Sequence, residues 1–354
     1  MKPFFKWSGG KRRETKVVRR YMPVQFDTFY EPFLGGGAIW LDLEHDKNVV
    51  NDSYPDVMNF YKVLKSDTHD FIKHVNQLST SYAQEMSNVE RDPKFEKQIE
   101  EVKGALGGIH DSNFKKVPAM SKSLKALLRA GELDKSKLGS VIDDLASWEE
   151  QVKKKRAELK ARKEEMNKPV YEIANNYYYY YRNNDFGSDF DKAVQFYILR
   201  QLSFSGMLRF DGNGKFNVPY GWYKSFKGIE ERPESVKDML DKTQLMCCDW
   251  KDSLATATKD DFVFLDPPYT RAFTDYHPNG QFGDQEHREL AEWFKTTNVP
   301  TMIILNRDEF TESLYGDYIL DDYDFKYSIQ YRDRMTEKDS NAKHFIATNY
   351  KKEC

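Results

Sequence analysis

The sequence contains little cysteine and no long apolar run. Its only cysteines, Cys247, Cys248 and Cys354, provide neither a disulfide framework nor the ligand spacing of a structural zinc site. No stretch reaches the roughly 18 apolar residues that a membrane span requires. The N-terminal sequence MKPFFKWSGGKRR also lacks the apolar core of a secretory signal. We therefore expect a protein of a reducing compartment that is neither exported nor embedded in a membrane.

A strong net charge and the standard phosphate-binding motifs are also missing. The 54 Lys and Arg residues nearly balance the 57 Asp and Glu residues, which gives a formal net charge of −3. A nucleic-acid partner would therefore have to bind a local basic face. The sequence has no GxGxxG pattern and no glycine loop followed by Lys-Ser/Thr, which argues against a dinucleotide or a nucleoside triphosphate as ligand.

Apolar runs of strand type alternate with helical patterns at both ends of the chain. The expected strands are 27–33, 48–52, 262–265, 300–305, 324–331 and 344–350. The expected helices are 38–43, 54–67 and 285–295. This alternation predicts an α/β fold with a mostly parallel sheet covered on both faces. The last two strands have no full helix between them, which predicts an antiparallel addition at one edge.

A glycine-rich turn lies between the first expected strand and its helix. Gly35, Gly36 and Gly37 carry no side chains, so a ligand could approach the backbone closely there. Asp52 ends the next strand, close to the spacing at which an acidic group accepts hydrogen bonds from ribose hydroxyls. Many glycine turns serve only to allow a positive φ. Together with the acid at the strand end, however, this turn predicts a site for a nucleoside without phosphates.

The apolar run at 262–265 ends abruptly in Asp266, Pro267, Pro268 and Tyr269. Proline stops a strand because it lacks an N–H and fixes its own φ, so the cluster has a purely structural interpretation. The functional alternative is that a ligand binds beyond the carboxyl ends of the strands, as it does in open α/β sheets. The local sequence leaves both interpretations open.

Two further segments combine aromatic and basic residues. The first, FFKWSGGK at residues 4–11, could be a simple N-terminal arm with a buried tryptophan. The second, at 200–224, contains several glycines and prolines and is expected to form turns and a hairpin. Its basic and aromatic residues are Arg200, Arg209, Lys215, Lys224, Phe204, Phe210, Phe216, Tyr220, Trp222 and Tyr223. This composition predicts a nucleic-acid surface, with a buried aromatic hairpin as the alternative.

Four segments, in this order, resemble the Dam-type, class α (D12) DNA N6-adenine methyltransferases: FFKWSGGK, YEPFLGGGAIWLDL with the later ND, SGMLRF…GKFNVPYG, and FVFLDPPY. The closing HFIATNY is similar to the last strand of that family. The resemblance covers residues 1–85 and 170–354. It implies a Rossmann-like methyltransferase sheet with a target-recognition domain, and S-adenosylmethionine as the methyl donor.

The resemblance also implies roles for individual residues. The expected cofactor-binding residues are Trp7, Lys11, Glu31, Pro32, Phe33, Gly35, Gly36, Gly37, Asp52 and Asp266. The expected catalytic residues are Asp266, Pro267, Pro268 and Tyr269. The residues expected to contact DNA are Lys6, Phe204, Ser205, Met207, Arg209, Lys215, Asn217, Pro219 and Tyr220. No metal is expected.

The implied chemistry depends on positioning rather than on a nucleophilic side chain. Adenine N6 is a poor nucleophile because the ring shares its lone pair. Asp266 and the carbonyl of Pro267 are expected to accept one N6–H each and to aim the lone pair at the methyl group. The extruded base could stack on Tyr269, while Phe204 and Met207 are candidates for filling the gap in the duplex.

The target sequence is less well defined than the chemistry. Where GATC-type members of the family commonly have Asn-Gly-Leu, this chain has Ser205-Gly206-Met207, and Trp222 stands where an arginine is common. GATC remains the expected target. An RNA base methyltransferase and a non-catalytic DNA-binding relative are the alternatives, and comparing duplex DNA with structured RNA as methyl acceptor separates the first of them.

Residues 1–70 and 250–354 are expected to form the catalytic domain, and 71–249 the target-recognition region. Within that region, apolar residues at helical spacing predict a helical insertion at 89–168, which the resemblance leaves unexplained. Its basic stretch KKKRAELKARKEE is either a solvated face or a contact to the DNA backbone. Some rings of the run Tyr177–Tyr181 are expected to meet a partner.

Double-stranded DNA is the expected partner, and a protein partner or a restriction nuclease is also considered. No membrane partner is expected, and the oligomeric state is not specified by the sequence. The expected location is the cytoplasm of a bacterial or phage-infected cell.

Overall fold

The structure is a computed structural model that describes residues 1–7, 9–90, 154, 157, 168–269, 282–326 and 341–351. Nearly all of the predicted insertion 89–168, and the end of the predicted strand 324–331, lie outside the described residues. The chain divides into two compact units, one of Met1–Thr80 with Tyr177–Cys354 and one of Ser81–Asn176. The sheet and the site described below belong to the first unit.

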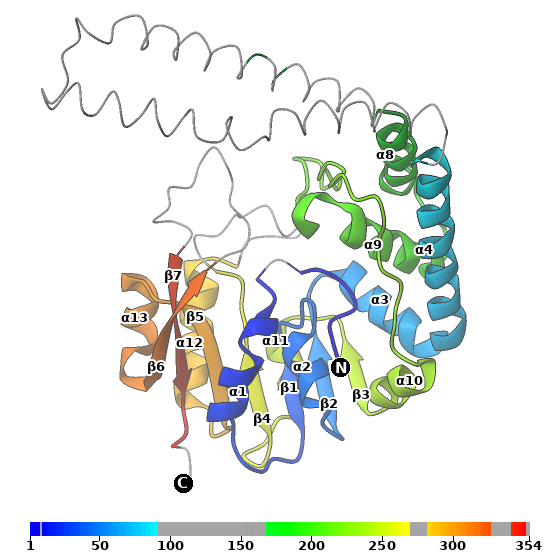
Figure 1. The fold of residues 1–354 in the computed structure, drawn as a ribbon. Helices are drawn as coiled ribbons and strands as arrows, with labels where there is room; N and C mark the ends of the chain where they lie inside the picture. Colours follow the sequence, from blue (N-terminus) through cyan, green and yellow to red (C-terminus); the bar gives the residue numbers. More distant parts are fainter. Residues whose placement is uncertain are drawn as a thin grey trace, which may run out of the picture. The chain divides into compact units, whose positions relative to one another are not determined.

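Seven strands form one mixed sheet in the order β3-β2-β1-β4-β5-β7-β6 (Figure 1). They are β1 (Phe29–Glu31), β2 (Asn48–Asn51), β3 (Thr243–Met246), β4 (Phe262–Leu265), β5 (Thr301–Asn306), β6 (Ile319–Lys326) and β7 (Asn341–Thr348). Strands β1 to β5 pair in parallel. Strand β7 is antiparallel to β5, and β6 is antiparallel to β7. The predicted mostly parallel sheet with an antiparallel edge is confirmed.

Helices precede and follow these strands in the described part of the chain. They are α1 (Thr15–Tyr21), α2 (Ala38–Leu43), α3 (Pro55–Ser66), α4 (Thr68–Glu90), α8 (Lys168–Asn183), α9 (Asp189–Leu202), α10 (Pro233–Asp241), α11 (Trp250–Ser253), α12 (Asp284–Thr296) and α13 (Glu309–Tyr315). Short 3-10 helices are η1 (Lys11–Arg13), η2 (Phe204–Gly206) and η4 (Gly316–Tyr318).

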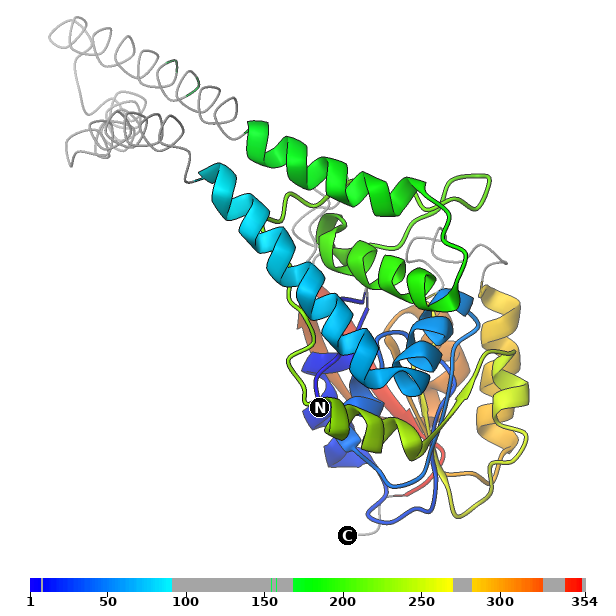
Figure 2. The same cartoon turned by 90° about the vertical axis from the view of Figure 1, so that its right-hand side faces the viewer.

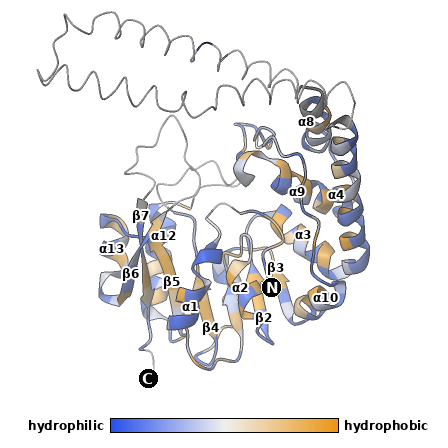
Figure 3. Cartoon of the chain, in the orientation of Figure 1, coloured by the Kyte–Doolittle hydropathy of each residue, from blue (hydrophilic) through white to orange (hydrophobic). Residues whose placement is uncertain are grey.

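Both faces of the central strands are buried. On one face, α11, α12 and α13 pack against alternate residues of the strands in a core that includes Trp250, Phe294, Val263 and Ile303. Helices α1 and α2 lie on the other face (Figures 1 and 2). Because both faces are covered, β4 is buried at every position, and its apolar colour contrasts with the mixed colour of β6 (Figure 3).

A second core of aromatic rings joins the N-terminal segment to α3 and α9. The ring of Phe5 lies 5.0 Å from that of Phe60 and 5.1 Å from that of Phe196, edge to face in both cases. Phe60 also stacks on Tyr197, with ring centroids 6.0 Å apart. Such rings contribute both buried area and specific geometry, so they fix the backbone of residues 4–7 against α9.

The sequence predicts turns and a hairpin for 200–224, but the segment begins in a helix. Its first residues close α9, and η2 follows, because apolar residues at helical spacing extend the helix through Leu202. Only the pairs Ser203 with Tyr220 and Phe210 with Phe216 form antiparallel bridges. The sequence patterns also miss β3, in which Thr243 and Gln244 are polar and only Thr243 is fully buried.

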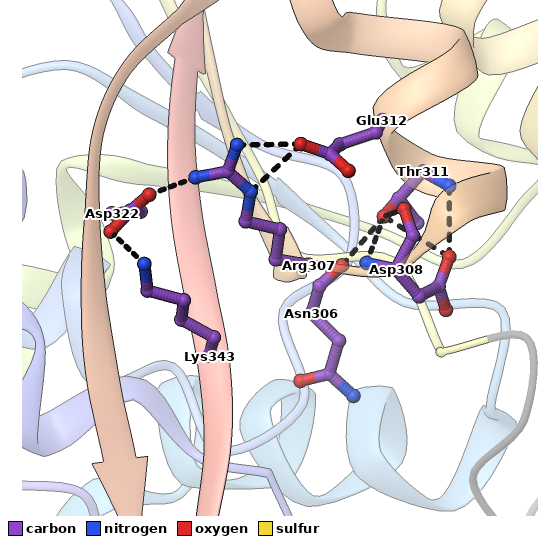
Figure 4. Close-up of polar contacts among 7 residues, drawn as sticks. All are labelled: Asn306, Arg307, Asp308, Thr311, Glu312, Asp322 and Lys343. Carbon is purple, nitrogen blue, oxygen red and sulfur yellow. Dashed lines mark hydrogen bonds and ion pairs between the residues drawn. The ribbon is translucent and has the colours of Figure 1, made fainter.

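The turn that follows β5 is held by a network of charges (Figure 4). The guanidinium of Arg307 donates to Glu312 on α13 at 2.9 and 2.5 Å and also to Asp322 on β6. Lys343 on β7 lies 2.7 Å from Asp322. Asp308 caps α13 by accepting from the amide of Thr311 at 2.9 Å. The network ties α13 to the antiparallel edge beside β5.

Candidate active site

The predicted site residues come together because three neighbouring strands are parallel. Strands β2, β1 and β4 are adjacent, so their carboxyl ends meet at one edge of the sheet. Asp52 follows β2, the glycine turn follows β1, and Asp266 follows β4. This edge, at a point where the order of the strands reverses, is where open α/β sheets bind ligands.

Asp266 forms an ion pair with Lys11 of η1. The Lys11 ammonium lies 2.7 Å from Asp266 Oδ1 and donates to the hydroxyl of Tyr269 at 2.6 Å. The Lys11 side chain is 3% exposed and that of Asp266 is 20% exposed. Within the described part of the chain, Oδ1 takes this contact and Oδ2 takes none. Asp266 therefore keeps one carboxylate oxygen that no described residue engages.

Burial and Lys11 act in opposite directions on Asp266. Burial disfavours the charged carboxylate and raises the pKa of Asp266 to about 6, although the Lys11 ammonium lowers it. Without the lysine, the buried carboxyl would hold its proton at still higher pH. Lys11 thus keeps Asp266 ionised near neutral pH.

Behind Lys11 lies a buried polar cluster that the sequence did not indicate. Glu14 Oε1 accepts hydrogen bonds from the ring of His344 at 2.8 Å and from the hydroxyl of Tyr323. Glu14 Oε2 lies 3.9 Å from the Lys11 ammonium. Burial raises the pKa of Glu14, but hydrogen bonds and the charges of His344 and Lys11 leave it below its usual value. Glu14 and His344 stand 330 positions apart, so no local spacing could have paired them.

The two prolines after Asp266 are held from α12. Neither proline has an N–H, so this segment offers few backbone donors of its own. The ring of His287 lies 2.9 Å from the carbonyl of Pro268, so Nε2 donates and Nδ1 is the unprotonated nitrogen. His287 is fully buried beside the ring of Phe282, and its Nδ1 has no hydrogen-bond partner among the described residues. Burial lowers the pKa of His287. A neutral histidine therefore fixes the Pro268 carbonyl.

The side chain of Trp7 packs against the glycine turn. A Cβ at Gly35 would stand 2.4 Å from Trp7 Nε1, and a Cβ at Gly36 would stand 2.8 Å from Trp7 Cβ. Gly35 also has φ +48°, which disfavours larger residues. Its amide donates to Asp52 at 2.8 Å, so the carboxylate after β2 holds the turn after β1. The close approach that the glycines permit is made here by Trp7.

Beneath this turn lies Glu31, which is 3% exposed. It accepts a hydrogen bond from the amide of Trp40 at 3.0 Å, which satisfies the start of α2. Burial raises the pKa of Glu31, and the charges of Asp266 and Asp52 raise it further. Two further carboxylates therefore lie close enough to Glu31 to oppose its ionisation.

Two other residues of this loop, Pro32 and Phe33, have structural contacts. The side-chain amide of Asn51 donates to the Pro32 carbonyl at 3.0 Å and to the Cys248 carbonyl at 3.1 Å, which joins the ends of β1, β2 and β3. The ring of Phe33 packs edge to face on Phe282 at 5.4 Å. Asn51 is a further positioning residue that the sequence did not single out.

Some residues expected to contact DNA lie on the surface, most of them in the recognition segment, residues 200–224. Phe204 is 46% exposed, and Ser205 follows it with φ +53°. Lys6 is exposed, and its ammonium lies 4.1 Å from the ring centroid of Tyr223. Other exposed side chains are Lys215, Pro219 and Trp222. Trp222 has φ +64°, an uncommon value for a bulky residue.

Other members of this expected set are held inside the fold. Met207 and Tyr220 are buried, and Tyr220 packs on Tyr178 with ring centroids 5.6 Å apart. The structure gives both residues packing roles, and their contact with DNA stays a prediction. Arg209 is half-buried and donates from Nε to Asn217 Oδ1 at 2.7 Å, which orients its guanidinium.

The place of Arg200 among basic and aromatic residues predicts a surface cation, and this prediction is wrong. It is 1% exposed and donates to backbone carbonyls. The side chain turns inward because α9 packs between residues 4–7 and the turn Ser205–Met207.

Two kinds of site are not seen in the described ranges. Among these residues, no group of three or more His, Cys, Asp or Glu side chains could hold a metal ion. No helix that the structure describes has the length and apolarity to cross a membrane.

Comparison with known proteins identifies the relatives of this chain. A family model described as D12 class N6 adenine-specific DNA methyltransferase matches residues 7–126 and 143–337. The matched ranges include much of the predicted insertion 89–168, which the sequence motifs left outside the resemblance.

Individual relatives cover most of the chain. The type II methyltransferase M.CviBI of Paramecium bursaria Chlorella virus NC1A is 26% identical over 99% of this chain and 100% of its own length. The retron Ec67 DNA adenine methylase of Escherichia coli is 30% identical over 90% of this chain and 82% of its own. The DNA adenine methylase of Haemophilus influenzae is 22% identical over 89% and 83%, respectively.

Proposed function

The chain belongs to the D12 class of N6 adenine-specific DNA methyltransferases, and from this membership we propose that it transfers the methyl group of S-adenosylmethionine to N6 of adenine in duplex DNA. The observation that carries the proposal is the Lys11–Asp266 ion pair, which stands at the carboxyl end of β4 beside the glycine turn. GATC remains the proposed target sequence.

The acidic groups at the sheet edge fit a cationic methyl donor. The charges of Asp52 and Asp266 both oppose ionisation of Glu31, and Lys11 supplies one positive charge beside Asp266. A sulfonium and an amino group would relieve this repulsion. Asp52 is half-buried, and each of its oxygens accepts one backbone N–H, from Gly35 and from Tyr54. The same carboxylate would accept a ribose hydroxyl of the cofactor.

Asp266 and the proline carbonyls would prepare the adenine amino group. S-adenosylmethionine supplies an electrophilic methyl group on a positively charged sulfur. Oδ2 of Asp266 accepts one N6–H, while Lys11 holds Oδ1 and keeps the carboxylate ionised. The carbonyl of Pro267 accepts the second N6–H. These two bonds draw N6 toward tetrahedral geometry and aim its lone pair.

The surroundings of these acceptors would keep them in place. His287 fixes the next carbonyl, that of Pro268, so the Asp-Pro-Pro segment has a defined direction. Tyr269 is held at its hydroxyl by Lys11, whose ammonium lies 4.9 Å from the ring centroid. An extruded adenine could stack on this anchored ring.

Base reading would depend on the recognition segment. Arg209 keeps several N–H donors beyond those that Asn217 engages, enough for the two acceptors of a guanine edge. The exposed ring of Phe204 is placed to occupy the gap left by an extruded base. The boundaries proposed for the recognition region remain 71–249, between catalytic segments 1–70 and 250–354.

The test is methyl transfer from labelled S-adenosylmethionine to unmethylated plasmid DNA, followed by long-read mapping of modified adenines. Structured RNA serves as the competing acceptor. Asp266→Ala should lower the single-turnover rate by about 100-fold to 1,000-fold, because one N6–H acceptor is lost. Asp308→Ala, which removes a carboxylate beyond the neighbouring strand β5, is the matched control and should retain most of the rate. Preferential labelling of RNA, or an Asp266→Ala rate above about a tenth of wild type, would refute the proposal.

A further inference from the structure

Arg200 joins two segments that belong to different halves of the proposed site. Its guanidinium donates to the Lys6 carbonyl from Nε at 3.2 Å and from Nη2 at 2.8 Å. It also donates from Nη1 to the Met207 carbonyl at 2.7 Å and from Nη2 to the Gly206 carbonyl. The same guanidinium lies 5.1 Å from the ring of Trp7. One buried cation thus holds both segments.

The first segment, Lys6–Trp7, touches both halves of the site. On one side, Trp7 packs against Gly35 and Gly36 of the turn at which the cofactor is proposed to bind. On the other side, a Cβ at Gly206 would stand 2.7 Å from Lys6 Cβ. Glycines therefore permit close backbone approach at both contacts, and a shift of this dipeptide would be transmitted in both directions.

The second segment is a turn that needs support. Ser205 has φ +53° and Gly206 has φ +62°, so two successive residues adopt the left-handed conformation. A non-glycine residue rarely takes this conformation unless its surroundings hold it there. The bonds from Arg200 to the Gly206 and Met207 carbonyls supply such a constraint, and they orient the chain between Phe204 and Arg209.

We propose that Arg200 is a positioning residue that couples occupancy of the cofactor site to reading of the DNA sequence. The inference rests on the proposed function. The guanidinium has no expected contact with either ligand; it sets the relation between Trp7 on the cofactor side and the Ser205–Met207 turn on the DNA side. Each ligand then favours the arrangement that the other binds.

Such coupling is reciprocal and can be measured as one number. The number is the ratio of the Kd of S-adenosylhomocysteine without DNA to its Kd with a saturating duplex that carries the mapped target site. Energetic couplings between sites typically correspond to about 5-fold to 150-fold changes in affinity. We expect the wild-type ratio to fall in this range, and to approach 1 with a duplex whose target site is altered.

Three variants separate coupling from simple packing. Arg200→Met keeps an unbranched apolar stem but removes all donors, and its ratio should fall below about 2. Arg200→Lys keeps the charge but cannot reach three carbonyls at once, so an intermediate ratio is expected. Arg182→Met is the matched control, because Arg182 also donates to a carbonyl of the recognition segment, that of Phe216 at 3.3 Å. Its ratio should equal that of wild type.

Packing damage is monitored separately. The Kd of S-adenosylhomocysteine alone and the circular dichroism of Arg200→Met should stay close to wild type. If Arg200→Met does not fold, Arg200→Lys and Gly206→Ala decide, since the added methyl disturbs the Lys6 contact from the other side. A wild-type ratio of 1, or wild-type ratios in the folded Arg200 variants, overturns the inference even if the enzyme methylates DNA. Absence of methyl transfer by wild type would instead refute the proposed function.

Discussion

Replacing Lys11 by methionine should move the pH dependence of methyl transfer rather than simply lower the rate. The Lys11 ammonium lies 2.7 Å from Asp266 Oδ1 in a buried position. In the proposed mechanism Asp266 is ionised when it accepts the adenine N–H, and its pKa is raised to about 6 even with the lysine present. Wild-type activity should therefore decline as the pH falls through about 6.

The size of the shift follows from the charge that is removed. An opposite charge at this range lowers a carboxyl pKa by about 1 to 3 units. Without Lys11, the acid limb of the profile should move upward by about that amount, to roughly pH 7 to 9. Each unit corresponds to about 1.4 kcal/mol between the two protonation states. Activity lost at neutral pH should return as the buffer becomes more alkaline.

The assay is single-turnover methyl transfer at saturating S-adenosylmethionine and DNA between about pH 5.5 and 9.5. Saturation matters because Lys11 is also proposed to contact the cofactor. Lys16→Met, which removes an exposed lysine on α1, is the control and should keep the wild-type limb. A Lys11→Met profile that is lower throughout but still bends near pH 6 would mean that Lys11 does not set the ionisation of Asp266.

Removing the negative charge of Glu14 should shift the acid limb of the pH profile in the opposite direction. The charge of Glu14 raises the pKa of Asp266. Glu14→Gln keeps an oxygen to accept from His344 and Tyr323 but removes this charge. Its acid limb should therefore lie below that of wild type. A limb that moves upward would show that loss of the buried cluster, rather than loss of charge, dominates.

Three further changes address other parts of the site. Burial lowers the pKa of His287, so the neutral form stabilises the fold above about pH 6.5, and this contribution is lost as the pH falls below that value. The variant His287→Gln can still donate to Pro268, so its thermal unfolding should depend less on pH in this window. Asp52→Ala should weaken S-adenosylmethionine by about 1.5 to 3 kcal/mol in calorimetric titration, and unchanged affinity would exclude Asp52 as the ribose acceptor. Arg209→Ala should relax selection at one base position by about 1 to 3 kcal/mol across a panel of duplexes, whereas a uniform loss would make Arg209 a phosphate contact.

The strand ends that carry the chemistry could be predicted because their signals are local. An apolar run ending in Asp-Pro-Pro locates β4, and three glycines before a helical pattern locate the start of α2, both to the residue. The strand expected at 27–33 is shorter in the structure, where β1 spans Phe29–Glu31. The order of the parallel strands then brings Asp52, Gly35 and Asp266 to one edge without further information.

The residues that support the site could not be predicted because their partners are distant in the sequence. Glu14 directly follows η1 and His344 lies on β7, the last strand. No sequence pattern links these two residues, yet they form a hydrogen bond in the core. Arg200 illustrates the opposite error. A basic residue among aromatic residues resembles a nucleic-acid surface, and only the packing of α9 shows that its donors are used by backbone carbonyls.

In the N-terminal segment, residues 4–11, the order of the residues matters more than their composition, because each residue contacts a different part of the fold. Phe5 packs in the aromatic core between α3 and α9, Lys6 meets the recognition turn, and Trp7 lies over the glycine turn. The chain then bends at Gly9, with φ +76°, and Lys11 reaches the carboxylate after β4. Each residue has a different partner, so a one-residue deletion would detach at least one of them while preserving the composition. The aromatic and basic character of the segment therefore follows from the partners that it must reach in turn.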